Sequence, residues 1–137
     1  MSSYQKSWLN DFESRINKDW VGFEDPMSLE ISEPTKCKVY ISACVKFTKN
    51  SELRRSIIHH GSLYYKILVN GESVNEYHVS DPLYHKKMTG ISLNASTDVS
   101  AGNTTVEVQY KLSKNGSWAL LNNQGKRELN ILSVPLA

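Results

Sequence analysis

Cysteine is scarce in this chain, with two in 137 residues. Cys37 and Cys44 lie in one apolar-rich run, CKVYISACVKF, and on a single strand their α-carbons would be separated by roughly 23 Å. A disulfide requires α-carbons within about 7 Å of each other, so the two cannot pair if this run is one strand. Two free thiols are typical of a reducing compartment.

The chain also lacks a charge imbalance and a long apolar run. Its formal net charge is +2 with 22% charged residues, and no basic or acidic block indicates a nucleic-acid partner. No window of about 18 consecutive apolar residues could cross a membrane. The opening stretch, MSSYQKSWLNDFESR, carries charges where a signal peptide needs an apolar core. We therefore expect a protein made in the cytoplasm, with neither a membrane nor nucleic acid as its partner.

No catalytic or nucleotide-binding motif is present. Neither a G-x-S-x-G nucleophile elbow nor a phosphate-binding glycine loop occurs, and the carboxylate pair Glu24-Asp25 is typical of a turn. The histidines lack the spacing of a zinc site, because adjacent ones such as His59 and His60 point their side chains apart. The sequence predicts a protein that is not an enzyme, with no catalytic residues, no metal site and no cofactor.

The N-terminal segment has a different residue pattern from the rest of the chain. Its apolar residues recur every four positions, at Tyr4, Trp8, Phe12, Ile16 and Trp20. On a helix they would form one apolar stripe, so the spacing predicts a helix over residues 4–20. The alternative is a turn-rich arm that bears two anchoring tryptophans. The segment is placed at residues 1–26, because Asp25-Pro26 ends any helix.

Residues 27–137 show the alternation of apolar and polar residues that strands with one core face have. A long strand is predicted from Val39 to Phe47, and Asn70-Gly71 supplies the type I′ turn of a hairpin. The polar residues 49–61 predict a loop, and a second Asn-Gly turn stands at 115–116. Together the segments predict an all-β fold, a jelly-roll β-sandwich of about eight antiparallel strands.

The stretch AGNTTVEVQY, residues 101–110, shows what such a strand offers for binding. Its apolar residues, Val106, Val108 and Tyr110, are predicted to point to the core. The polar residues between them then form an outer face that meets solvent or a neighbouring subunit. A closing strand with the same alternation is predicted over residues 126–136.

Two groups of residues are candidates for binding. Tyrosines and a tryptophan that share an exposed face would stack on sugars, and the candidates are Tyr64, Tyr84 and Trp118. Tyr65 belongs to the apolar alternation and is predicted to be core. The N-terminal apolar stripe either packs on the protein's own sandwich or anchors the subunit to another chain. The candidate anchors are Trp8, Phe12 and Trp20.

The C-terminal part, DVSAGNTTVEVQYKLSKNGSWALLNNQGKRELNILSV, resembles jelly-roll domains found in structural proteins and appendages of tailed-bacteriophage virions. The matching features are the small-residue corner Ala101-Gly102, the adjoining Asn103-Thr104-Thr105-Val106, Tyr110, a variable hairpin, and Arg127 before a closing strand. An early tryptophan segment followed by a long strand also fits. Asn103 departs from the pattern, since this position is often histidine in these domains.

These domains are similar in architecture to the trimeric C1q and tumour-necrosis-factor folds, which associate through strand faces. The resemblance therefore implies a homotrimer and a place in the virion. The chain lacks the long shaft of a fibre, so the implied protein is a capsid decoration, head-fibre or tail-adaptor subunit, which self-assembles and attaches to other virion structural proteins. The alternative is a carbohydrate-binding or host-receptor-binding β-sandwich module, with a host surface glycan as partner.

Overall fold

The computed structural model describes residues 1–8, 12–15, 19–23, 25–49, 62–80, 89–113, 120–123 and 127–136. Its secondary structure in these ranges consists of strands. They are β1 (Ser2–Trp8), β2 (Phe12–Arg15), β3 (Val21–Gly22), β4 (Ser28–Glu33), β5 (Cys37–Lys49), β6 (Ser62–Val69), β7 (Glu72–Ser80), β8 (Thr89–Val99), β9 (Gly102–Ser113), β10 (Leu120–Asn123) and β11 (Arg127–Pro135). None of the described residues belongs to a helix long and apolar enough to cross a membrane.

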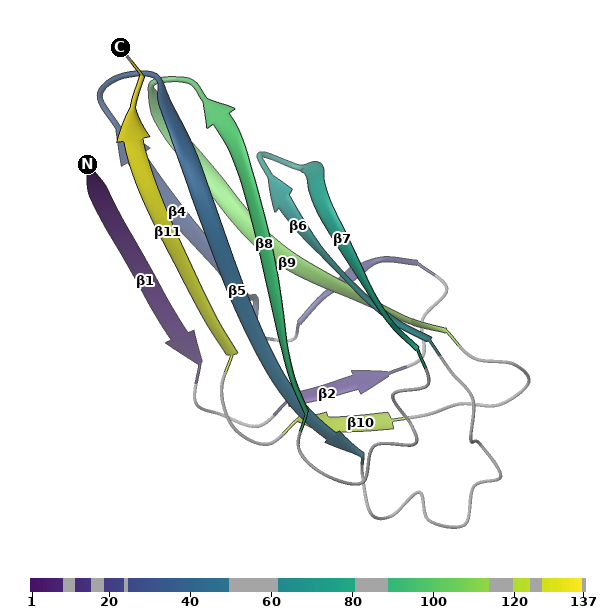
Figure 1. The fold of residues 1–137 in the computed structure, drawn as a ribbon. Coiled ribbons are helices and arrows are strands. Elements are labelled where there is room, and N and C mark those ends of the chain that lie inside the picture. The colour runs from purple at the N-terminus through teal and green to yellow at the C-terminus, as the bar shows by residue number, and fades with distance from the viewer. Residues whose placement is uncertain are drawn as a thin grey trace.

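The strands form two antiparallel sheets that pack face to face (Figure 1). The first sheet has the order β1-β11-β5-β8, and the short pair β10 and β2 extends it beyond the end of β5. The second has the order β4-β9-β6-β7. The short strand β3 pairs with the same edge of β9 as β4 does, next to the end of β4.

This connectivity is that of a jelly roll. When the eight longer strands are numbered in chain order, the first sheet reads 1-8-3-6 and the second 2-7-4-5. Every neighbouring pair joins an odd-numbered strand to an even-numbered one, and all these pairs are antiparallel. Most of the paired strands are far apart in the sequence, as in two interleaved Greek keys. The predicted all-β jelly-roll sandwich of about eight strands is confirmed.

The core lies between the two sheets and is built by alternation along each strand. In β5, Val39, Ile41, Ala43 and Val45 are buried while Tyr40 and Ser42 between them are exposed. In β9 the same alternation buries every second residue from Thr104 to Tyr110. Because each strand turns one face inward, the sandwich buries a continuous apolar layer and leaves two outer faces available for contacts.

The helix predicted over residues 4–20 is wrong, because Ser2–Trp8 is strand β1, paired along its whole length with β11. A spacing of four residues is also a multiple of two, so Tyr4 and Trp8 share one face of a strand as well as one face of a helix. β5 occupies one edge of β11, and β1 pairs with the other edge, which satisfies the backbone hydrogen-bonding groups of β1 on that side. The division of the chain at residue 26 stays a prediction.

Several local predictions are confirmed. Val39–Phe47 lies within β5, which also holds both cysteines as free thiols. Asn70 and Gly71 have φ values of 50° and 84°, as the two central residues of a type I′ turn require. The closing strand is β11. The turn at 115–116 and residues 50–61 of the expected loop lie outside the described residues.

Candidate functional site

A row of aromatic and basic side chains crosses the outer face of the second sheet. Strand register creates this row: Lys111 on β9 lies opposite Tyr64 on β6, which lies opposite His78 on β7. Trp20 immediately precedes β3, whose Val21 pairs with Tyr110 of β9, so Trp20 lies beside Lys111. We call these four residues the aromatic row.

The members of the aromatic row contact one another closely. The rings of Tyr64 and His78 stack with centroids 4.5 Å apart, and Trp20 meets Tyr64 edge to face at 6.3 Å. The Lys111 ammonium lies 5.1 Å from the centroid of the Tyr64 ring and 5.5 Å from that of Trp20. Lys66, one outward position along β6, places its ammonium 4.5 Å from the Trp20 ring. Such cation–π contacts hold both lysine side chains across the rings.

The arrangement suits binding to a protein surface better than stacking on a flat ligand. His78 covers one face of the Tyr64 ring, and Lys111 and Trp20 also lie against it. What remains for a partner is a compact, partly apolar surface with two ammonium groups. Aromatic residues of this kind are enriched at the centres of protein interfaces.

The structure brings one candidate anchor and one candidate sugar-stacking residue together, and it places the other anchoring tryptophan elsewhere. Trp20, a candidate anchor, lies beside Tyr64, a candidate for sugar stacking. Trp8, the other anchoring tryptophan, is 4% exposed and lies in the core. An attachment role for Trp8 stays a prediction, and it would require β1 to leave the sheet.

The remaining candidates cannot be placed. Phe12 belongs to β2, but its side chain lies outside the described residues, as do Tyr84 and Trp118. His78 is exposed on β7, whereas the other three histidines are outside the description. Among the described residues, no group of three or more His, Cys, Asp or Glu side chains is placed to hold a metal ion.

Sequence reasoning missed Lys111 and His78 as members of the row. Their outward direction follows from the alternation along each strand, because Tyr110 points inward and Lys111 follows it. Their proximity to Tyr64 depends on which strands pair and in what register, and the alternation is the same for any register.

Arg127 organises the inner side of the first sheet where β11 begins. It is fully buried, with its guanidinium carbon 4.9 Å from the centroid of the Phe23 ring and 5.6 Å from that of Trp8. Its Nη1 donates a hydrogen bond of 2.8 Å to the carbonyl of Asp25, whose carboxylate is 4.0 Å from Nη2. Burial lowers the pKa of Arg127, and the charge of Asp25 opposes that shift. This contact ties β11 to the segment that leads into β4.

A second polar contact joins the edges of the two sheets. The Tyr4 hydroxyl on β1 donates a hydrogen bond of 2.8 Å to Oε1 of Glu33 on β4 and also lies 3.0 Å from the carbonyl of Ser32. The hydrogen bond from Tyr4 lowers the pKa of Glu33, and the same bond raises the pKa of Tyr4. The contact therefore favours an ionised Glu33 and a protonated Tyr4.

No known protein family matches the chain, and no curated protein matches it in sequence. Solved structures do match its fold. One is the VP2 protein of infectious bursal disease virus from derived T=1 particles, with a TM-score of 0.56 and 15% identity over 94% of this chain and 31% of the VP2 chain. Another is the Gt strain of the same virus, with a TM-score of 0.54 and 14% identity over 99% of this chain and 38% of that one.

This chain thus spans about a third of the length of the viral chains it matches. A family 35 carbohydrate-binding module from an environmental isolate is also similar, with a TM-score of 0.45 and 12% identity over 100% of this chain and 98% of that one. At these identities, the likeness to the viral proteins establishes the jelly-roll fold alone.

Proposed function

We propose that this protein is a non-enzymatic structural subunit of a virus particle. The observation that carries the proposal is the fold match: 94% or more of this chain aligns with jelly rolls of proteins solved from, or as part of, a virus particle. A jelly roll can build such a particle without any catalytic chemistry, because its two outer faces provide surfaces for neighbouring subunits.

The proposed subunit assembles through the aromatic row, and its partner there is a second copy of the chain. Trp20 and Tyr64 provide the apolar centre that a stable contact needs, and Lys66 and Lys111 stand beside them to pair with acidic groups of the neighbour. The C1q-like resemblance favours a homotrimer. A contact of about 800 Å² per partner is sufficient for a stable complex.

The proposal extends to the kind of virus particle and the place of the subunit in it. The subunit is a capsid decoration, head-fibre or tail-adaptor protein of a tailed bacteriophage, made in the host cytoplasm and then incorporated into the virion. The C-terminal resemblance supports this assignment. Attachment to other virion proteins would use the N-terminal segment.

Native mass in solution tests the assembly. We expect light scattering to give about three times the chain mass of 15.5 kDa, and Lys111→Glu to shift the protein toward monomer because it places a like charge where the neighbour is acidic. Lys38→Glu is the matched control, since it makes the same charge change on the outer face of the other sheet. A wild-type monomer at high concentration, or equal effects of both variants, contradicts assembly through this row.

A further inference from the structure

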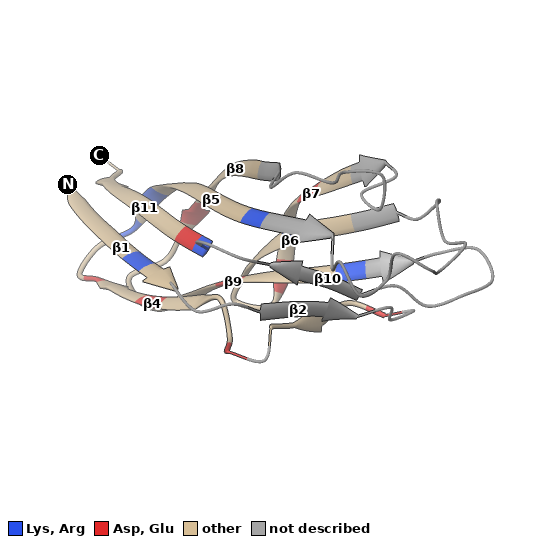
Figure 2. Ribbon diagram, turned by 90° about the horizontal axis from the view of Figure 1, so that it is seen from below, with Lys and Arg blue, Asp and Glu red and all other residues tan. Residues whose placement is uncertain are grey.

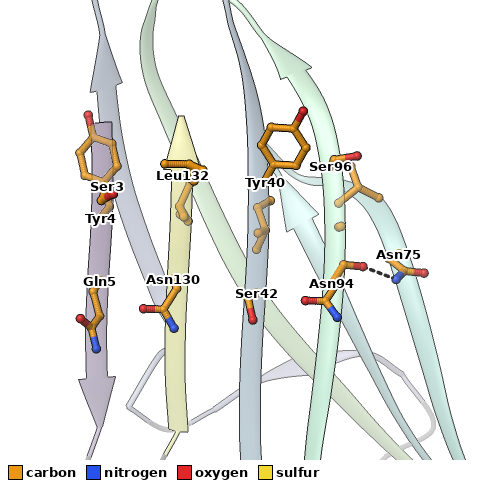
Figure 3. A pocket seen from close by; sticks show the side chains of 14 residues that line it. Ser3, Tyr4, Gln5, Tyr40, Ser42, Asn75, Asn94, Ser96, Asn130 and Leu132 are labelled. Atoms are coloured by element: carbon orange, nitrogen blue, oxygen red, sulfur yellow. Dashed lines mark hydrogen bonds between the residues drawn. The ribbon is translucent and has the colours of Figure 1, made fainter. Parts of the chain in front are cut away.

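The outer face of the first sheet carries an open hollow of about 950 Å³ whose lining has no charged side chain. Strand register arranges the polar residues of this hollow in a line across four strands: Gln5 on β1 lies opposite Asn130 on β11, Asn130 opposite Ser42 on β5, and Ser42 opposite Asn94 on β8. We call these four residues the polar row, and Figure 3 shows them side by side.

The next row along the sheet adds an aromatic ring. Ser3, Leu132, Tyr40 and Ser96 occupy the equivalent positions on the same four strands. Tyr40 is 47% exposed, which is high for an aromatic residue at mid-strand. Asn75 of β7 borders the far side and donates a hydrogen bond of 2.6 Å to the backbone carbonyl of Asn94, as the dashed line in Figure 3 marks.

The hydrogen bonds within the hollow leave much of the polar row available to a ligand. Glu128 accepts from the side-chain amide nitrogens of Gln5 at 2.8 Å and Asn130 at 3.2 Å, which leaves their side-chain oxygens to accept from another partner. No hydrogen bond links the side chains of Ser42 or Asn94 to another described residue, so both can donate and accept.

Folding accounts for Asn75, whose side chain bonds two backbone groups beside the register shift of β7, but not for Asn94 and Asn130. Asparagine is depleted in strands, where β-branched residues fit better, yet Asn94 and Asn130 both lie at mid-strand. The two signs of charge are spread along the strands elsewhere in the described chain (Figure 2). The lining of the hollow is uncharged on a protein with 22% charged residues, and the charges beside it, Glu128 and Lys38, are already engaged by its polar and aromatic side chains. The lining therefore favours a neutral ligand.

We infer that this hollow binds a neutral oligosaccharide. Vicinal hydroxyls donate and accept hydrogen bonds, as the amides and hydroxyls of the polar row do. The Tyr40 ring, 47% exposed beside the Lys38 ammonium that lies 5.7 Å from its centroid, offers apolar surface to the C–H groups of a sugar. Four strands spaced about 4.8 Å apart give the row a length of roughly 14 Å, which suits several linked sugars rather than one. The volume is that of an ordinary ligand site. The inference does not depend on the proposed assembly, which uses the other sheet.

The test begins with an array of neutral oligomers of glucose, mannose, xylose and N-acetylglucosamine, with acidic oligosaccharides alongside. We expect the wild-type protein to bind at least one neutral series, with affinity that increases with oligomer length. Calorimetry on that series should show that Asn94→Ala and Tyr40→Ala each weaken binding about tenfold, the effect of one lost hydrogen bond or ring contact. Gln109→Ala removes an amide from the outer face of the opposite sheet and should bind like wild type.

Independent evidence comes from amide chemical shifts of the unmodified protein during titration with the bound oligomer. Shifts centred on Ser42, Asn94 and Asn130 support the site even if a variant is unstable. The inference is overturned if no neutral series binds at millimolar concentration, if only acidic saccharides bind, or if the shifts centre on the aromatic row. It is equally overturned if Tyr40→Ala lowers the native mass instead of saccharide binding, because the hollow would then be a subunit contact.

Discussion

Arg127 is the residue at which burial and charge conflict most directly. A buried cation is costly unless it is paired, and here two aromatic rings and the Asp25 carbonyl and carboxylate surround it. Asp25 itself is 55% exposed, so water weakens this ion pair. The packing of the long side chain between Trp8 and Phe23 is therefore the larger part of what Arg127 contributes.

We predict that Arg127→Ala lowers the free energy of unfolding by about 3 kcal/mol, because it leaves a cavity between two rings. Arg127→Met should cost much less, since an apolar side chain of similar length fills the space without a buried charge. Urea denaturation of the two variants measures the difference. Equal losses would instead assign the stabilisation to the charged hydrogen bonds with Asp25.

At the scale of the element, β1 is an edge strand that the Tyr4–Glu33 contact fastens to the other sheet. The lowered pKa of Glu33 means that its contribution to stability is present above its ordinary value of about 4.3 and is lost as the pH falls through the lowered value. The raised pKa of Tyr4 means that its contribution is complete below about 10 and is lost as the pH rises through the raised value. The contact is therefore intact at neutral pH.

We predict that Tyr4→Phe destabilises the protein at pH 7 and has a smaller effect at acidic pH, below the lowered pKa of Glu33. Denaturation at both pH values measures this, and hydrogen exchange should show faster opening of β1 at pH 7. Tyr40→Phe, which removes a hydroxyl from the outer face of the same sheet, is the control and should not alter the pH dependence. A pH dependence unchanged by Tyr4→Phe would show that Glu33 does not act through Tyr4.

For the whole molecule, the two tryptophans of the N-terminal segment have different surroundings. Trp8 fills the core between the sheets, whereas Trp20 is half-buried on an outer face against Tyr64 and two lysines. The first therefore stabilises the fold, and the second is available to a neighbouring subunit. Jelly rolls that assemble need both properties, a closed core and an outer surface with apolar area.

We predict that Trp8→Ala lowers the free energy of unfolding by about 3–5 kcal/mol, whereas Trp20→Ala changes it by less than about 1 kcal/mol. Trp20→Ala should nevertheless reduce incorporation into particles in a complementation assay, because it removes the apolar centre of the aromatic row. Comparing calorimetric melting with particle composition separates these effects. Normal incorporation of the Trp20 variant would count against assembly through the aromatic row.

The sequence by itself determined the strand pattern after residue 26, the long strand β5, the type I′ turn and the inward direction of residues such as Tyr65 and Val108. These properties follow from alternation and turn chemistry, which act between residues close in the chain. The same local signal could not distinguish strand from helix for Tyr4 and Trp8, since a spacing of four fits both.

Only the tertiary structure decided which side chains meet. Gln5 pairs with Asn130, and Trp20 reaches Lys111 through the pairing of β3 with β9, across most of the chain length in both cases. Pairing at this separation depends on how all the strands share one core. A shift of register by two residues would keep the same alternation, but the side chains of the polar row and the aromatic row would no longer lie opposite one another. The polar row and the aromatic row are therefore properties of the jelly roll, whereas the residues that compose them are properties of the sequence.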